Sequence, residues 1–371
     1  MSESKAKYKF LIGAGGTGGH LYPAIAVVDA LKKQLPNSEF YFCGRNDKIE
    51  AKVVPALNYN FIPVDIKGIG KVFSINTITA LLSLQKARGF LKKKIKELNI
   101  DSVICTGAYI SVPPGKAAKS CGIPLFLMES NVNPGKAINM LSKDADRIFT
   151  SFDETSSYFP KSYANRIFTT GNPIRKEITN LPSRTESLRK YGLSPDSKTI
   201  LIFGGSLGAA SINKAVEDNI VELSKYGQIL WQTGQDYEIK SSLPANVKTL
   251  KYIDDMASAF SAADLVVSRS GATTIAELCI TAKPAILIPL KTASCNEQNH
   301  NANVLMERTG CAMIDNDEIG LKLVDTVKAF MTNDNLLIGI SNKLAALANP
   351  NSADIIAKEI INFLDKKNGT T

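Results

Sequence analysis

Histidine, tryptophan and closely spaced cysteine pairs are scarce in this 371-residue chain. Its two histidines are His20 and His300, and its six cysteines are scattered without a Cys-x-x-Cys pair. This scarcity excludes a histidine-rich metal centre, a zinc site built from cysteine pairs and a disulfide framework. The sequence therefore predicts no metal site and no cofactor.

Long uncharged apolar runs are also missing. No stretch of about eighteen such residues occurs, so we expect no membrane-spanning helix. Residues 1–5 carry mixed charge and lead directly into an apolar strand, without the apolar core of a signal peptide. With 44% hydrophobic and 21% charged residues the chain can build sizeable cores, so we expect a soluble cytoplasmic protein of two domains.

Acidic residues are absent from residues 67–96, which hold eight lysines and arginines. The charge of the whole chain is uneven, because residues 1–180 carry a net charge of +11 whereas residues 181–371 carry −2. A positive field of this kind attracts polyanions. Nucleic acid, anionic lipid headgroups and pyrophosphate-bearing substrates are the candidates.

Short apolar segments alternate with amphipathic helical patterns along both halves of the chain. Such alternation predicts an α/β protein of two doubly wound, Rossmann-like parallel sheets that face a central cleft. We expect domains at residues 1–170 and 171–351, with the carboxy-terminal segment 352–371 packing back on the first. The longest expected helix is 75–98. The expected strands are residues 8–12, 39–43, 60–64, 102–105, 125–128, 147–150, 199–203, 229–232, 247–250, 265–267 and 285–288.

A glycine-rich loop follows the first strand of each half. Residues 13–20 read G-A-G-G-T-G-G-H, and residues 203–209 read F-G-G-S-L-G-A. Glycines allow a sharp turn and let a ligand approach main-chain amides at the start of a helix. The first loop is a poor dinucleotide fingerprint, because the second strand ends in Cys43-Gly44-Arg45 without the acid that holds an adenosine ribose. A substrate-cradling loop is favoured over a purely structural turn.

Polar side chains in the second half suit a sugar nucleotide. Glu277 lies one turn inside an expected helix, where its carboxylate can accept two hydrogen bonds from a ribose diol. The alternative is a solvated surface glutamate. Residues 296–302 gather amide side chains that suit hydroxyl-rich ligands. Asp254 and Asp255 precede a helical pattern, which favours N-capping over metal binding.

Six motifs stand in order along residues 10–302: G-G-T-G-G-H, N-P-I-R, G-G-S-x-G-A, Y-I-D-D-M, S-R-S-G-A-x-T-x-x-E and Q-x-x-N-A. This set resembles the MurG family of glycosyltransferases. The resemblance implies the GT-B fold and an inverting transfer of GlcNAc from UDP-GlcNAc to the C4 hydroxyl of an undecaprenyl-pyrophosphoryl-linked muramoyl-pentapeptide, in peptidoglycan synthesis. It also implies a peripheral enzyme on the cytoplasmic face of the inner membrane.

The resemblance implies that the second domain holds the donor. The Ile253 main chain would read the uracil edge, Glu277 the ribose diol and Gln298 the GlcNAc hydroxyls. Arg175 and Asn131 would reach the donor from the junction and from the first domain. The residues assigned to the pyrophosphate are Ser206, Ala272, Thr273 and Thr274.

The resemblance also places the acceptor chemistry in the first domain. Thr17, Gly18 and Gly19 would lie near the sugar and the acceptor pyrophosphate. His20 and Glu129 are the candidates to deprotonate the acceptor hydroxyl, and His20 is favoured because an imidazole titrates near neutral pH. Two family motifs are altered here, since G-G-Y-x-S-G-P appears as G-A-Y-I-S-V-P at 107–113 and H-E-x-N as M-E-S-N at 128–131.

The basic stretch 67–96 interleaves apolar residues with lysines, which suits an anionic membrane surface. The alternative is a helix whose apolar face packs into the core and whose lysines are solvated. Other functions also stay open. Another GT-B enzyme acting on a UDP-sugar, such as a UDP-GlcNAc epimerase or a glycolipid synthase, is the nearest rival. A nucleic-acid-binding protein is disfavoured because the basic residues are mainly lysine without an RNA-binding signature, and a nicotinamide-dependent dehydrogenase is more distant.

Overall fold

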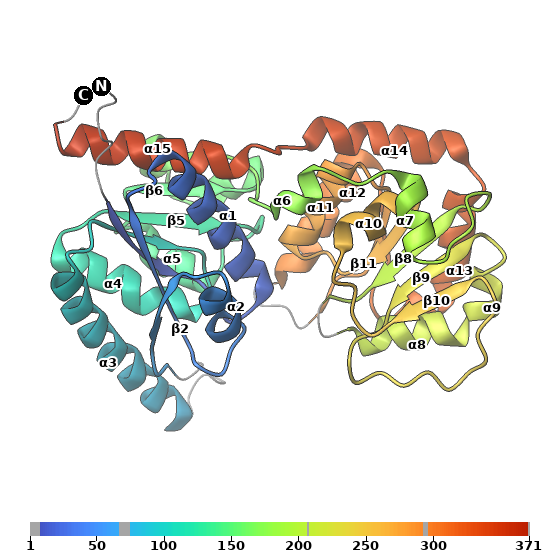
Figure 1. Cartoon of the computed structure of the whole chain (residues 1–371), viewed down its shortest axis with the longest axis horizontal. Coiled ribbons are helices and arrows are strands. Elements are labelled where there is room, and N and C mark those ends of the chain that lie inside the picture. Colours follow the sequence, from blue (N-terminus) through green and yellow to red (C-terminus); the bar gives the residue numbers. More distant parts are fainter. Residues whose placement is uncertain (1–7, 67–74, 206–207, 292–295, 370–371) are drawn as a thin grey trace. The chain divides into compact units, whose positions relative to one another are not determined.

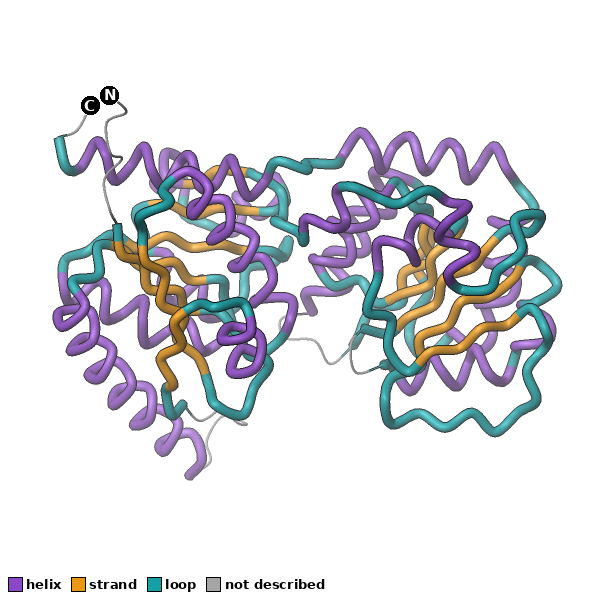
Figure 2. The backbone as a smooth tube through the Cα atoms, viewed as in Figure 1, coloured by secondary structure: helices purple, strands orange, loops and turns teal. Residues whose placement is uncertain are grey.

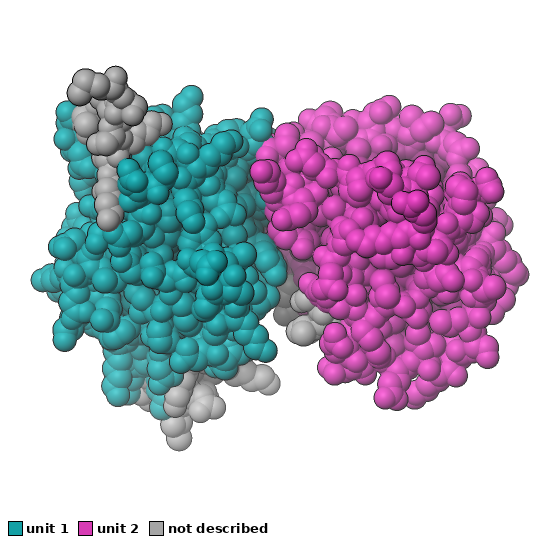
Figure 3. Space-filling model, viewed as in Figure 1, with its two compact units in different colours: residues 1–174, 351–371 teal, residues 175–350 magenta. Residues whose placement is uncertain are grey.

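The computed structural model describes residues 8–66, 75–205, 208–291 and 296–369, which form two compact units (Figure 1). Unit 1 comprises residues 1–174 and 351–371, and unit 2 comprises residues 175–350 (Figure 3). The chain thus passes from unit 1 to unit 2 between Ile174 and Arg175, and it returns after Pro350. Each unit is an α/β domain with a parallel sheet, so the fold class predicted from the sequence is confirmed.

Unit 1 contains a seven-stranded parallel sheet in the order β3-β2-β1-β4-β5-β6-β7. Its strands are β1 (Lys9–Gly13), β2 (Glu39–Gly44), β3 (Asn60–Pro63), β4 (Ser102–Cys105), β5 (Leu125–Glu129), β6 (Arg147–Thr150) and β7 (Ile167–Thr169). Its helices are α1 (Gly18–Gln34), α2 (Glu50–Ala56), α3 (Ile75–Leu98), α4 (Val112–Cys121), α5 (Lys136–Ser142) and α15 (Ser352–Lys367).

Helices cover both faces of the unit 1 sheet (Figure 2), because successive side chains of each buried strand point to opposite faces. In β1, Phe10 and Ile12 join the core beneath α1 and α15, whereas Leu11 joins the core beneath α3 and α4. The carboxy-terminal helix α15 lies beside α1 (Figure 1) and contributes a buried stripe at a spacing of four residues: Ile356, Ile360 and Leu364. This stripe makes the last helix of the chain part of the first core.

Unit 2 contains a six-stranded parallel sheet in the order β10-β9-β8-β11-β12-β13. Its strands are β8 (Thr199–Phe203), β9 (Gln228–Gln232), β10 (Val247–Leu250), β11 (Leu265–Ser268), β12 (Ala285–Leu287) and β13 (Ala312–Met313). Its helices are α6 (Lys176–Thr179), α7 (Arg184–Lys190), α8 (Ala210–Asp218), α9 (Ile220–Leu223), α10 (Met256–Ala262), α11 (Ala272–Thr281), α12 (Glu297–Thr309), α13 (Ile319–Met331) and α14 (Asp334–Leu347).

The strand order reverses beside the first strand of each sheet. In unit 1 the reversal lies between β1 and β4, and in unit 2 between β8 and β11. Loops that leave the carboxyl ends of such strands diverge, and α/β folds bind ligands in the crevice between them. Both glycine-rich loops therefore begin at the position of their sheet where a ligand site is expected.

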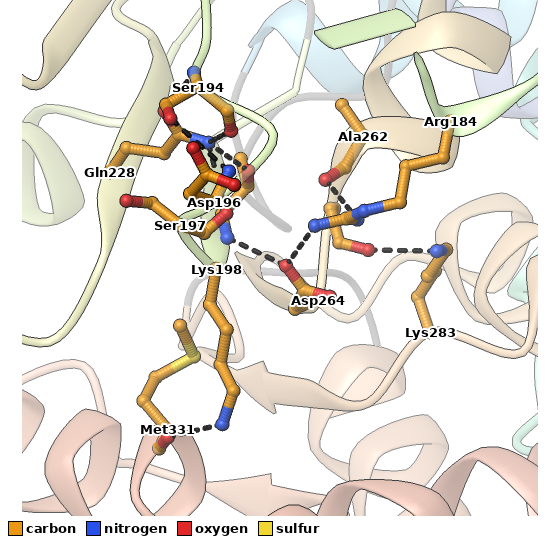
Figure 4. Close-up of polar contacts among 12 residues, drawn as sticks. Arg184, Ser194, Asp196, Ser197, Lys198, Gln228, Ala262, Asp264, Lys283 and Met331 are labelled. Carbon is orange, nitrogen blue, oxygen red and sulfur yellow. Dashed lines mark hydrogen bonds and ion pairs between the residues drawn. The ribbon is translucent and has the colours of Figure 1, made fainter.

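A polar cluster closes the opposite, amino-terminal edge of the unit 2 sheet (Figure 4). Asp264 Oδ2 accepts hydrogen bonds from the Thr199 N–H and from the Arg184 guanidinium, both at 2.7 Å. Gln228 accepts from the Ser194 N–H at 2.8 Å and donates to the Thr199 hydroxyl at 3.0 Å. These groups satisfy one another's hydrogen-bonding capacity, so the cluster has a structural role and holds the starts of β8, β9 and β11 together.

Candidate functional site

His20 lies in the first turn of α1, which begins at Gly18. The Thr17 hydroxyl lies 3.0 Å from His20 Nδ1, and the Thr106 hydroxyl donates to the His20 carbonyl at 2.8 Å. Gly107 has a φ of +99°, and a Cβ built there would lie 3.1 Å from Cδ2 of the His20 ring. The loop after β4 thus provides the space that the imidazole occupies.

The His20 imidazole is neutral at physiological pH. Its side chain is half-buried, and burial lowers the pKa of His20 to about 4. In the tautomer that carries its proton on Nδ1, the ring donates to Thr17 and presents the lone pair of Nε2. This arrangement leaves Nε2 able to accept a hydrogen bond and a proton from a hydroxyl group, but the lowered pKa removes the near-neutral titration for which His20 was favoured over Glu129.

Glu129, the other candidate base, closes the loop that follows β5. Its Oε1 accepts from the Asn131 N–H at 2.8 Å and from Asn131 Nδ2 at 3.2 Å, and its Oε2 accepts from the Gly135 N–H at 2.8 Å. The carboxylate is buried. Both oxygens therefore hold the loop main chain, and the Asn131 side chain is turned back toward Glu129.

The N-P-I-R motif at residues 172–175 is anchored in both units. Asn172 is buried in unit 1 and accepts a hydrogen bond from the Ser130 hydroxyl at 2.9 Å. Arg175, three residues later, belongs to unit 2 and donates to Glu277 Oε1 at 3.1 Å. The motif thus ends in a direct contact with the carboxylate that the sequence assigns to the ribose.

Glu277 lies in α11, which follows β11, and its residue is only 5% exposed. The solvated surface glutamate considered as an alternative is therefore wrong. Burial raises the pKa of Glu277, and the charge and hydrogen bond of Arg175 act in the opposite direction. A buried carboxylate with one cationic partner is suited to bind hydroxyl donors, because each added hydrogen bond offsets part of the desolvation.

The second glycine-rich loop is held by Gln232, a buried residue at the end of β9 that sequence reasoning missed. Gln232 donates to the Gly205 carbonyl at 2.9 Å and accepts from the Ile253 N–H at 2.8 Å. It therefore joins the loop to the segment assigned to uracil. Ser206, the predicted pyrophosphate ligand of this loop, lies outside the described residues.

The segments at 268–274 and 296–302 are joined to each other. The Ser270 hydroxyl donates to the Gln298 carbonyl at 2.8 Å, and Gln298 Oε1 accepts from the Leu290 N–H at 2.9 Å. Ala272, Thr273 and Thr274 form the first turn of α11. A Cβ built at the preceding residue, Gly271, would meet nothing within 4 Å in the described structure, so a ligand can approach this turn closely.

The aspartate pair at 254–255 has the structural role expected from its position. Asp255 is the N-cap of α10, and its Oδ1 accepts from the Ser258 N–H at 3.0 Å. The prediction of N-capping is confirmed. Among the residues that the structure describes, no group of three or more histidine, cysteine, aspartate or glutamate side chains is placed to hold a metal ion.

The first part of the basic stretch, residues 67–74, lies outside the described residues, and the rest forms most of α3. One face of α3 packs into the core through Leu84, Leu91 and Ile95. Leu82 and Phe90 are nevertheless exposed, at 58% and 41%. They help to line a groove of about 510 Å³ between α3 and the end of β3, which Lys86 also lines. No helix in the described ranges is long and apolar enough to span a bilayer.

Comparison with known proteins agrees with these two units. Residues 10–150 match the glycosyltransferase family 28 N-terminal domain, and residues 199–356 match the glycosyltransferase family 28 C-terminal domain.

The chain is also similar over nearly its full length to curated relatives. It is 34% identical to the UDP-N-acetylglucosamine–N-acetylmuramyl-(pentapeptide) pyrophosphoryl-undecaprenol N-acetylglucosamine transferase of Parabacteroides distasonis, over 97% of this chain and 100% of that protein. It is 36% identical to the protein of the same name from Porphyromonas gingivalis, over 98% and 97%. The crystal structure of Acinetobacter baumannii MurG superposes with a TM-score of 0.74 at 25% identity, covering 97% of this chain and 100% of that one.

Proposed function

The chain belongs to glycosyltransferase family 28, and from this premise we propose that it transfers GlcNAc from UDP-GlcNAc to a muramoyl-pentapeptide carried on undecaprenyl pyrophosphate. The reaction inverts the anomeric carbon, adds the sugar to the C4 hydroxyl of the muramoyl residue and serves peptidoglycan synthesis. Unit 1 binds the acceptor and unit 2 binds the donor. The named relatives support this proposal, because the chain is similar to them across both units.

The observation that carries the donor site is the ion pair between the partly exposed Arg175 and the buried Glu277, beyond the carboxyl end of β11. In the proposed complex, the ribose hydroxyls donate to Glu277 and add hydrogen bonds that a buried carboxylate otherwise lacks. Arg175 then balances the negative charge that develops on the leaving UDP. The turn at Ala272, Thr273 and Thr274, together with Ser206, binds the diphosphate, and main-chain amides aimed at developing charge lower the barrier to its departure.

The acceptor hydroxyl is deprotonated by His20. A neutral imidazole oriented by Thr17 can take the proton as the hydroxyl attacks the anomeric carbon. Thr17, Gly18 and Gly19 line this part of the site, and Glu129 keeps Asn131 in place. If His20→Ala retains near-normal turnover with intact UDP binding, this assignment is wrong.

A transfer assay tests the function directly. Labelled UDP-GlcNAc is incubated with the full chain, with and without a lipid-linked muramoyl-pentapeptide, and the labelled lipid product and released UDP are measured. We expect product and UDP in equal amounts, and both only in the presence of the acceptor. Epimerisation of the sugar nucleotide in the absence of acceptor would favour the rival GT-B enzyme.

Contact with an anionic membrane surface is proposed through α3 and the basic stretch 67–96. The exposed Leu82 and Phe90 support shallow insertion, and the neighbouring lysines support attraction to anionic headgroups. This placement would bring the enzyme to the cytoplasmic face of the inner membrane, where a lipid-linked acceptor is reached.

Sedimentation with vesicles tests the membrane contact. We expect binding to vesicles rich in phosphatidylglycerol at low salt, weaker binding at high salt, and a marked loss in a Leu82→Ser/Phe90→Ser variant. Leu321→Ser is the matched control, since Leu321 is 84% exposed but belongs to unit 2. Absence of binding at every salt concentration would refute the proposal.

A further inference from the structure

Glu50 is a buried carboxylate beneath the first glycine-rich loop, and none of the six sequence motifs includes it. It lies in the first turn of α2 and has 0% of its surface exposed. Its Oε2 accepts from the Gly16 N–H at 2.9 Å, and its Oε1 accepts from the Arg45 N–H at 3.0 Å. Burying a carboxylate is costly unless it is hydrogen-bonded, so these two main-chain contacts are strongly favoured.

The slot that holds this carboxylate is formed by two glycines. A Cβ at Gly15 would lie 2.4 Å from Glu50 Cδ, and a Cβ at Gly44 would lie 2.3 Å from Glu50 Cγ. Real side chains do not approach so closely. The glycine at 15 in the first loop and the glycine at the end of β2 are therefore both required for Glu50 to reach the loop.

The same carboxylate connects the loop to the rest of the carboxyl edge of the sheet. Arg45, whose N–H it binds, donates through its guanidinium to the Ile66 carbonyl at 2.8 Å and to the Tyr109 hydroxyl at 3.1 Å. Tyr109 begins the short helix that follows Gly107, the residue against the His20 ring. The loops after β1, β2 and β4 are thus linked around Glu50 and Arg45.

We propose that Glu50 is a positioning residue for the transfer reaction: by holding Gly16, it fixes the loop conformation that presents Thr17 and His20 to the acceptor. This inference rests on the proposed function. Glu50 acts within unit 1, whereas the residues assigned to uracil and ribose belong to unit 2. Loss of Glu50 therefore lowers kcat, and kcat/KM for the acceptor, by about 10-fold to 100-fold, because small misplacements of reacting groups have effects of this size. KM for UDP-GlcNAc and the affinity for UDP stay near the wild-type values.

The first test uses Glu50→Gln in the full chain. The substitution keeps the shape but sets an amide NH2 group against one of the two N–H donors. Glu97→Gln is the matched control, because Glu97 lies in the same unit at the exposed end of α3. Both variants are assayed for kcat and for KM of each substrate. UDP calorimetry reports the fraction of molecules with an intact unit 2, and denaturant unfolding of the full chain reports the folding of unit 1. We expect Glu50→Gln alone to lower kcat, and kcat/KM for the acceptor, while KM for UDP-GlcNAc stays near the wild-type value.

A second variant keeps Glu50 and moves it. Gly44→Ala forces the carboxylate away from Gly16 without changing the charge or the loop sequence. It should therefore lower kcat and leave KM for UDP-GlcNAc unchanged, even if Glu50→Gln fails to fold. The double variant should be no slower than the slower single variant, since both act through one contact. The inference is wrong if either folded single variant has wild-type kinetics per folded molecule, or if KM for UDP-GlcNAc rises as much as kcat falls. A wild-type chain that transfers no GlcNAc would instead overturn the proposed function.

Discussion

The two glycine-rich loops occupy equivalent positions in their sheets but are held by opposite chemistry. In unit 1 a buried carboxylate, Glu50, binds the loop through the Gly16 N–H. In unit 2 a buried neutral amide, Gln232, binds the loop through the Gly205 carbonyl. The first anchor uses a main-chain donor and places negative charge behind the loop, whereas the second uses an acceptor and adds no charge. An anionic diphosphate is therefore better suited to the second loop. Of the two groups predicted near Thr17, Gly18 and Gly19 in the first loop, the neutral sugar is favoured over the acceptor pyrophosphate.

The largest effect is expected on the stability of unit 2, when a side chain is added to the second glycine-rich loop. Gly208 has a φ of +78°, and a Cβ there would lie 2.3 Å from the Thr233 carbonyl oxygen. We expect Gly208→Ala to lower the free energy of unfolding of unit 2 by about 3 kcal/mol, from overpacking and backbone strain together. Gly205→Ala is the control, because its φ is also positive at +98° but its Cβ would enter open space. Denaturant unfolding that shows equal losses for both variants would contradict the packing described for this loop.

The next largest effect is on UDP binding, which distinguishes the roles of Glu277 in unit 2 and Glu50 in unit 1. We expect Glu277→Gln to weaken UDP binding by about 30-fold, or about 2 kcal/mol, the size of a hydrogen bond to a charged group. Glu50→Gln should leave UDP binding unchanged. Calorimetry with UDP measures both, and a comparable loss in the two variants would break the assignment of donor and acceptor to different units.

The pH dependence of UDP binding sharpens the role of Arg175. Burial raises the pKa of Glu277 and Arg175 lowers it again, so the carboxylate is protonated at a higher pH than an ordinary glutamate. UDP affinity should thus fall as the pH drops through this pKa, and Arg175→Gln should move the midpoint to higher pH because the cationic partner is lost. Calorimetry between about pH 4 and 7 gives the midpoint, and the curve for Glu277→Gln supplies the titration of the nucleotide itself. A midpoint that moves down in Arg175→Gln would contradict the ion pair.

The smallest effect concerns strain in unit 1. Ala108 has φ and ψ of 52° and 167°, a combination that glycine adopts almost exclusively, whereas Ala282 in unit 2 has the ordinary left-handed values of 52° and 40°. Ala108→Gly should raise the free energy of unfolding by about 1 kcal/mol, and Ala282→Gly by less. Denaturant titration of both variants measures the difference, and destabilisation by Ala108→Gly would show that the alanine is not strained.

The sheets could be predicted from the sequence because their signal is local. Eleven strands were predicted from apolar segments, and the helix predicted at 75–98 has the bounds of α3. The strands missed were β7 and β13, which have three and two residues and are not fully buried. So short a segment has no periodicity to detect.

The predicted site residues came from motifs, whereas the residues missed act through contacts that no motif records. Glu50 reads as one more charged residue in a short helix, and its burial depends on Gly16, 34 positions earlier. Gln232 likewise reads as the end of a strand, until the loop at 204–205 and the segment at Ile253 are folded against it. Gly44 could have drawn attention to Glu50, because this glycine has no side chain and so leaves the space that Glu50 fills in the folded chain.

The return of α15 to unit 1 constrains how this protein is made. The first 174 residues leave the ribosome long before Ile356, Ile360 and Leu364 are synthesised, so the earliest domain to emerge waits for the final helix to complete its core. Unit 2 can meanwhile finish folding, because all of its strands and helices lie within one continuous segment. Nascent chains arrested before residue 351 should consequently expose the apolar surface that α15 covers in the complete protein. We expect chaperones to bind to that exposed surface.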